Sequence, residues 1–194
     1  MDLRISQARY IAAVSLAVDV KDVRKYLTGV HVTLLPGGGG ARITASNGHI
    51  LLRADDESTI CNGDFPASIV QFTPDQLRAF KKKSNLDKPV DLTIVDDKTM
   101  RVEFDYTTSN AVIIDGVFPD VGRVIPELTD RQPLANAIPP ALDQDYVAIM
   151  CTAARTMSAR ASFRLHYSDD ENSVRVSFPQ SPAALGVVMP MRIK

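Results

Sequence analysis

The side chains best able to do acid–base or metal chemistry are scattered along this sequence. The three histidines, His31, His49 and His166, stand in three separate strand-like regions. None belongs to a Gly-x-Ser-x-Gly or His-Glu-x-x-His motif, which would bring a nucleophile or a metal ligand beside it. Without a convergent acid, base or nucleophile, we expect no catalytic residue and predict that the chain is not an enzyme.

Acidic clusters and a glycine run offer two further kinds of chemistry. Carboxylates gather at 55–57, 96–97 and 169–171 and could hold Mg²⁺. Two of these clusters fall at expected hairpin turns, where aspartate is common because it hydrogen-bonds the turn backbone. The glycine run 37–40 lacks the Gly-Lys-Ser/Thr and the following helix of a phosphate-binding loop, so it is predicted to be a hairpin turn. We expect neither a metal nor a cofactor.

The composition is that of a globular protein. The chain has 194 residues, of which 45% are hydrophobic and 23% charged, enough to bury one good core or two small ones. Its two cysteines, Cys61 and Cys151, have no histidine at ligand spacing and are expected to be buried small apolar residues. No apolar run reaches the roughly 18 residues of a membrane span, and no signal peptide is recognisable, so we expect a cytoplasmic protein without membrane contact.

The charge balance limits how nucleic acid could be bound. The formal net charge is −1 and the pI about 6.3, so any such binding must come from a local basic face. Tryptophan is absent and aromatic residues make up 6% of the chain, which argues against a protein that stacks single-stranded bases.

Three amphipathic helices must position whatever site exists. The first is expected over 6–18, the second from Thr73, and the third from near Asp143. Thr73 can cap its helix, a proline follows at the first helical position, and Gln76 can complete a capping box. The third helix should bury a stripe of apolar residues at spacings of four, three and four, with Arg155 on another side.

Alternating strands follow each helix, which predicts a repeat. The three expected helix starts are 67 and 70 residues apart, and each helix precedes a meander of antiparallel strands. We therefore predict an α+β fold made of three helix-plus-meander units. An odd number of units leaves a sheet edge exposed unless a partner chain covers it, so oligomerisation is expected.

Four short segments, read in order, resemble the bacterial sliding clamp, the beta subunit of DNA polymerase III. They are residues 22–30, 45–51, 115–126 and 187–193. The most specific are Phe118-Pro119-Asp120 followed by Arg123-Val124-Ile125-Pro126, and the closing Val188-Met189-Pro190-Met191-Arg192. The resemblance implies a DNA-clamp fold of one complete domain and a half domain. Residues 1–126 resemble the complete middle domain, and residues 127–194 the second half of the last domain.

In the clamp family these segments line a hydrophobic cleft that takes a short peptide from polymerases and other partners. The resemblance carries fourteen residues into that cleft: Leu27, Ser46, Gly48, His49, Leu51, Pro119, Arg123, Val124, Val187, Val188, Met189, Pro190, Met191 and Arg192. Leucine, valine and methionine suit an adaptable apolar floor, and the histidine and arginines a polar rim. Ile50 stands where the family has arginine, which would remove one rim contact. Periodicity alone would also allow 187–191 to be a buried terminal strand.

Clamps meet duplex DNA through helices that line the hole of a ring and contact phosphates without reading sequence. The resemblance implies DNA-binding roles for eight basic residues: Arg9, Lys21, Arg78, Lys81, Lys82, Lys83, Arg155 and Arg160. Lysines near helix ends are also often merely solvated and favourable to the helix dipole.

Two functions are compatible with these sequence features. The first is a processivity factor that encircles duplex DNA without sequence preference and tethers polymerase through the cleft, with a clamp loader as a further partner. If twelve units close the ring as in the family, three units per chain require a homotetramer, in which lone third units pair. The alternative is a ringless module that binds clamp-binding peptides and regulates or competes with the replisome.

Overall fold

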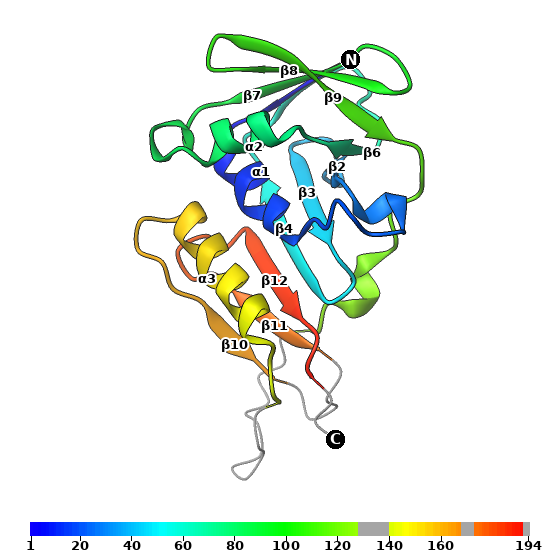
Figure 1. Cartoon of the computed structure of the whole chain (residues 1–194). Helices are drawn as coiled ribbons and strands as arrows, with labels where there is room; N and C mark the ends of the chain where they lie inside the picture. The colour runs from blue at the N-terminus through cyan, green and yellow to red at the C-terminus, as the bar shows by residue number, and fades with distance from the viewer. Residues whose placement is uncertain (128–139, 168–172, 192–194) are drawn as a thin grey trace.

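Twelve antiparallel strands form one continuous sheet, and three α-helices lie side by side against it (Figure 1). The computed structural model describes residues 1–127, 140–167 and 173–191. Within them, the strand order across the sheet is β10-β11-β12-β4-β3-β2-β6-β9-β8-β7-β1-β5. The strands are β1 Asp2–Ile5, β2 Val30–Leu34, β3 Ala41–Ser46, β4 Ile50–Asp56, β5 Ile60–Asn62, β6 Ser68–Gln71, β7 Val90–Ile94, β8 Thr99–Phe104, β9 Thr107–Ile114, β10 Arg164–His166, β11 Val174–Ser177 and β12 Ala184–Val188.

The second helix, α2 (Pro74–Lys81), begins where the capping pattern predicts. The Thr73 side chain accepts a hydrogen bond from the Gln76 backbone N–H at 3.2 Å, and the Gln76 side chain accepts one from the Thr73 N–H at 2.8 Å. This reciprocal capping box satisfies two backbone donors that would otherwise have no partner in the helix. Phe80 is fully buried, and Leu77 is partly buried against the core.

The first and third helices also follow the predicted pattern, with shorter bounds for the first. α1 spans Ala8–Val14 and continues as a 3₁₀ turn over Ser15–Ala17. α3 spans Gln144–Met157 and is capped by Asp143, whose carboxylate accepts from the Asp145 N–H at 2.8 Å. Arg155 is exposed while Met150 and Met157 are buried, so the predicted division of this helix into faces is confirmed.

The chain repeats one unit three times, as predicted. α1 goes with β2–β4, α2 with β7–β9, and α3 with β10–β12. The first two units exchange strands, because β1 pairs with β7 of the second meander and β6 pairs with β2 of the first. This exchange joins the two units through a single hydrophobic core.

The third unit continues the same sheet. β12 pairs antiparallel with β4, from Ala184 opposite Ala54 to Val188 opposite Ile50. On the helical side, α3 packs against α1, which in turn packs against α2. The joint between the first and third units is therefore both a strand pair and a helix pair.

The periodicity of the sequence does not predict three of the strands, β1, β5 and β6. Each has only three or four residues, too few to show a period, and each owes its conformation to partners far away in the chain. β4 and β9 also run longer than the alternation predicted. The longest helix, α3, has 14 residues, and among the described residues no helix is long and apolar enough to cross a membrane.

Candidate functional site

An apolar pocket of about 250 Å³ lies where β4, β12 and two irregular segments meet. Leu51 on β4 stands directly opposite Val187 on β12, and both side chains are buried. Leu27, at the end of a short 3₁₀ turn, belongs to a separate buried cluster with Phe118. Val121 packs against both clusters, so the segment after Phe118 joins the two walls of the pocket.

A tight turn at 46–50 forms one side of the rim. The Asn47 side-chain oxygen accepts hydrogen bonds from the backbone N–H groups of His49 and Ile50 at 3.0 and 2.9 Å. The Ser46 hydroxyl accepts from the Gly48 N–H and donates to the Ile50 carbonyl. These local bonds fix the turn, because asparagine and serine side chains substitute for missing backbone partners.

An arginine lies against this turn. Arg24 donates to the Asn47 carbonyl at 3.0 Å and forms a salt bridge with Asp22 at 2.6 Å. The Arg24 hydrogen bond holds the pKa of the Asp22 carboxyl at about 2, well below its ordinary value. Gly48 has φ of +88°, and a Cβ there would lie 2.8 Å from the Arg24 guanidinium, so the close approach depends on glycine.

His49 joins three elements at the rim. Its ring stacks on Tyr146 of α3 with centroids 5.8 Å apart, and its carbonyl accepts from the Met189 N–H at 2.8 Å. Met189 follows β12 and is 38% exposed, so its flexible side chain stands at the pocket mouth. A methionine in this position can adapt its shape to different apolar side chains.

Nine of the fourteen residues assigned to the cleft by resemblance line this pocket. They are Leu27, Ser46, Gly48, His49, Leu51, Pro119, Val124, Val187 and Met189. They come from all four of the segments that carried the resemblance, which are far apart in the chain.

Four of the other five assigned residues do not line it. Val188 is fully buried in the main core, since neighbouring residues of a strand face opposite sides and Val187 faces the pocket. Arg123, Pro190 and Met191 lie outside the pocket lining, Arg123 and Met191 being exposed to solvent. Arg192 lies outside the described residues.

Five further residues line the pocket and were not assigned to it: Arg24, Tyr26, Ile50, Asp120 and Val121. All five lie within the segments that carried the resemblance, so the signal was their adjacency to assigned positions. Ile50, which replaces the family's arginine, is buried to 2% exposure and contributes apolar surface to the pocket.

The eight basic residues implied for DNA binding belong to the three helices or to the segments just after them. Arg9 differs from the others, because its guanidinium donates to the Met157 carbonyl and pairs with Asp87. It therefore ties α1 to the end of α3. Arg78 pairs with Asp75 on its own helix but stays exposed. The remaining six are exposed: Lys21, Lys81, Lys82, Lys83, Arg155 and Arg160.

The other residues considered for chemistry have structural roles. His31 stacks on Phe118 with centroids 4.6 Å apart, and burial lowers its pKa. The buried Asp56 carboxylate accepts hydrogen bonds from Ser6, Ser58 and Thr59. Within the described ranges no three His, Cys, Asp or Glu side chains gather as metal ligands would, and residues 169–171 lie outside those ranges. Both cysteines are half-buried, less than expected.

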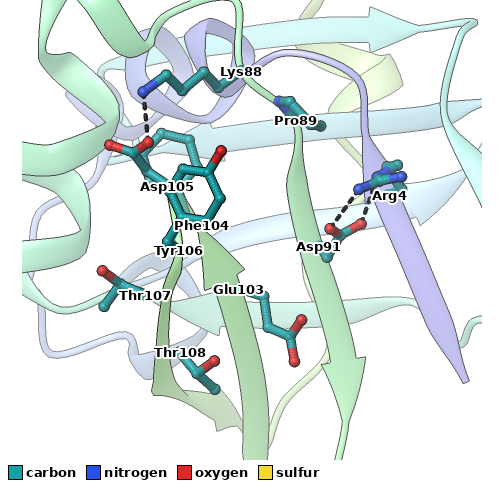
Figure 2. Close-up of a pocket in the computed structure, with 10 residues that line it drawn as sticks. All are labelled: Arg4, Lys88, Pro89, Asp91, Glu103, Phe104, Asp105, Tyr106, Thr107 and Thr108. Carbon is teal, nitrogen blue, oxygen red and sulfur yellow. Dashed lines mark hydrogen bonds and ion pairs between the residues drawn. The ribbon is translucent and has the colours of Figure 1, made fainter.

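A second, polar cavity of about 600 Å³ lies beside the β8–β9 hairpin (Figure 2). Arg4 pairs with Asp91 at 2.8 Å, and Lys88 pairs with Asp105 at 2.6 Å. Both cations of the cavity are matched by carboxylates, and Glu103 is its one charged lining residue without a salt bridge in the described part of the chain.

Comparison with known proteins assigns the family. Residues 5–120 match the model of the DNA polymerase III beta subunit, central domain. A beta sliding clamp from Caulobacter vibrioides (strain NA1000 / CB15N) is 30% identical over 157 residues, or 79% of this chain. Those residues are 40% of the relative, so the chain spans well under two thirds of its length.

Solved structures show the same fold over the whole chain. The DNA polymerase sliding clamp from Pseudomonas aeruginosa superposes with a TM-score of 0.78 at 20% identity, covering 100% of this chain and 66% of that one. The DNA polymerase III subunit beta from Borrelia burgdorferi gives 0.74 at 14% identity, covering 100% and 65%. The predicted DNA-clamp fold is thereby confirmed. The chain belongs to the DNA polymerase III beta subunit family, the family of the bacterial sliding clamps.

Proposed function

We propose that this chain is a sliding-clamp-like processivity factor, which encircles duplex DNA and tethers a polymerase through the pocket between β4 and β12. The observation that carries the proposal is the convergence of four distant segments on one apolar pocket with a polar rim. Such a pocket suits a short peptide with large apolar side chains. No catalysis is required, because a tethered polymerase rebinds its template at high effective concentration.

In this proposal residues 1–126 act as a complete clamp domain and residues 127–194 as a half domain. The proposed cleft also includes Arg123, Pro190, Met191 and Arg192, which lie next to lining residues or follow them in the sequence. The exposed cations of the helical layer face the DNA backbone and hold it by non-specific attraction. Four chains close the ring, a clamp loader opens it, and the protein works in the cytoplasm.

Peptide binding tests the cleft directly. The probe is a fluorescent synthetic peptide carrying the clamp-binding motif of a bacterial replicative polymerase, and the readout is anisotropy. Replacing Met189 by Ala should weaken binding at least about tenfold, because the side chain at the pocket mouth no longer covers apolar surface of the peptide. The matched control is Val95→Ala, which removes an exposed apolar side chain from the β7–β8 turn. Equal binding by Met189→Ala and the unmodified chain would refute the placement of the cleft.

A ringless module that binds clamp-binding peptides and regulates or competes with the replisome is the second candidate. It is favoured by the lining of the pocket, which comes entirely from this one chain and requires no ring. Both candidates bind the peptide, so DNA topology separates them. A ring should stay on closed circular duplex in high salt and leave when the circle is cut, whereas a ringless module should be released equally from both forms.

A further inference from the structure

The internal repeat of the fold assigns a role to the outer edge of β9. In the first unit, the side of β4 away from β3 pairs with β12, and α1 packs against α3. β9 occupies in the second unit the place of β4 in the first, and α2 the place of α1. The surface formed by β9 and α2 is therefore the repeat-related counterpart of a surface that already binds a strand and a helix.

The corresponding edge of β9 is open within the described part of the chain. β6 pairs with β9 only at Val112, Ile113 and Ile114, so the edge over 107–111 has no partner strand there. α2 is fixed to this strand, since the Gln76 side chain donates to the Ser109 hydroxyl at 2.8 Å. Beside them is a hollow of about 560 Å³ whose apolar lining includes Leu77 and the half-exposed Val112.

The open edge lacks the usual protection against strand pairing. Exposed edges are normally short, charged, bulged or interrupted by proline. β5 and β10 have three residues each, and β10 carries Arg164 and His166. β9 has eight residues, and its sequence over 107–114 contains no charge and no proline.

We propose that β9 pairs antiparallel with β9 of a second copy of this chain, across a two-fold axis. An uncharged strand can meet its own copy without like-charge repulsion, and a two-fold contact closes on itself. This contact rests on the proposed function only in that it would be one of the contacts that close the ring. The contact itself requires neither peptide binding nor DNA binding.

Pairing centred on Ser109 uses the open part of the edge and leaves β6 in place. In that register the two strands pair over 107–111, with residue 107 of each copy facing residue 111 of the other, and β6 keeps its pairing with 112–114. Tyr106 has a relative exposure of 107% and φ of +63°, an uncommon conformation for a bulky residue in a two-residue hairpin turn. The turn that carries Tyr106 in each copy then meets the other copy where β6 joins β9.

Opposite charges placed on β9 test the contact. Asn110→Lys and Asn110→Glu each put like charges close together in a self-paired dimer, and each should weaken association at least about tenfold. A one-to-one mixture of the two variants should recover association, because the charges then attract across the axis. The matched control is Gly39→Lys at an exposed turn tip with no neighbour within 4 Å, which should associate as the unmodified chain does.

Light scattering across a range of concentrations gives the mass of each sample, and peptide anisotropy is measured on the same samples. The proposal expects recovery in the mixture together with unchanged peptide binding by both variants. A single chain at every concentration, or an association that neither Asn110 substitution changes, would overturn the β9 contact. If the unmodified chain did not bind the peptide, this would count against the proposed function and would leave the β9 contact unaffected.

Discussion

At the scale of single residues, Gly48 controls how Arg24 sits at the rim of the pocket. Replacing Gly48 by Ala forces a side chain into a left-handed conformation and pushes a Cβ to 2.8 Å from the Arg24 guanidinium. We expect a loss of about 1 kcal/mol in the free energy of unfolding, together with weaker peptide binding. Urea denaturation and peptide anisotropy measure the two effects.

The control for this substitution is Gly39→Ala. Gly39 lies in an exposed turn, a Cβ at this position would have no neighbour within 4 Å, and its φ lies outside the left-handed region. The substitution should leave both stability and peptide binding unchanged. If Gly48→Ala behaved in the same way as Gly39→Ala, the glycine would not be needed for the geometry of the rim.

His31 makes stability depend on pH. Burial lowers its pKa in the folded protein, so below the ordinary value of about 6.5 the unfolded chain binds the proton more readily. Stability should therefore fall as the pH drops through about 6.5 toward the folded-state pKa. Urea unfolding of the unmodified chain and of His31→Leu, across this range, measures the effect. Acid should destabilise the variant less than the unmodified chain. An unchanged pH dependence would show that other groups cause the acid-induced destabilisation.

At the scale of elements, the capping box of α2 is a local feature with a measurable contribution. Replacing Thr73 by Ala removes the hydroxyl that accepts from the Gln76 N–H. The free energy of unfolding should fall by about 1 kcal/mol, the typical cost of losing a helix cap. Thr73→Ser, which retains the hydroxyl, should lose much less in the same urea denaturation. Equal losses would show that the methyl group, and not the cap, matters.

Some helices and strands could be predicted from sequence patterns and others could not. The starts of α2 and α3 were predictable because capping residues act within one turn of their helix. β1 and β6 were not, because their pairing with β7 and β2 depends on the exchange of strands between the first two units. Resemblance brought together the segments of the pocket. The resemblance also assigned Val188 to the cleft, although the alternation of side chains along β12 places it in the core. It assigned Arg9 to DNA binding, although the Arg9 guanidinium donates to the Met157 carbonyl at the contact between α1 and α3.

At the scale of the whole molecule, the helical layer should make duplex binding depend on salt. Lys82 and Lys83 are exposed at the end of α2. If both neutralise phosphates, replacing them by Ala should reduce the slope of log K against log salt by about 0.9 for each phosphate that is no longer neutralised. Binding to a fluorescent duplex over a salt series measures the slope. An unchanged slope would remove these lysines from the DNA face, and Lys98→Ala in the β7–β8 turn is the control.

Assembly decides whether the chain can tether a polymerase to DNA in the way proposed, because topological retention requires a closed ring. Two contacts would build it: β9 with its own copy, and the third unit with another third unit. Light scattering on a size-exclusion column, over a range of concentrations, gives the absolute mass of the unmodified chain and so distinguishes a closed ring from a single chain. A closed ring predicts a stable particle of four 21.2 kDa chains. A single chain at every concentration would contradict ring closure.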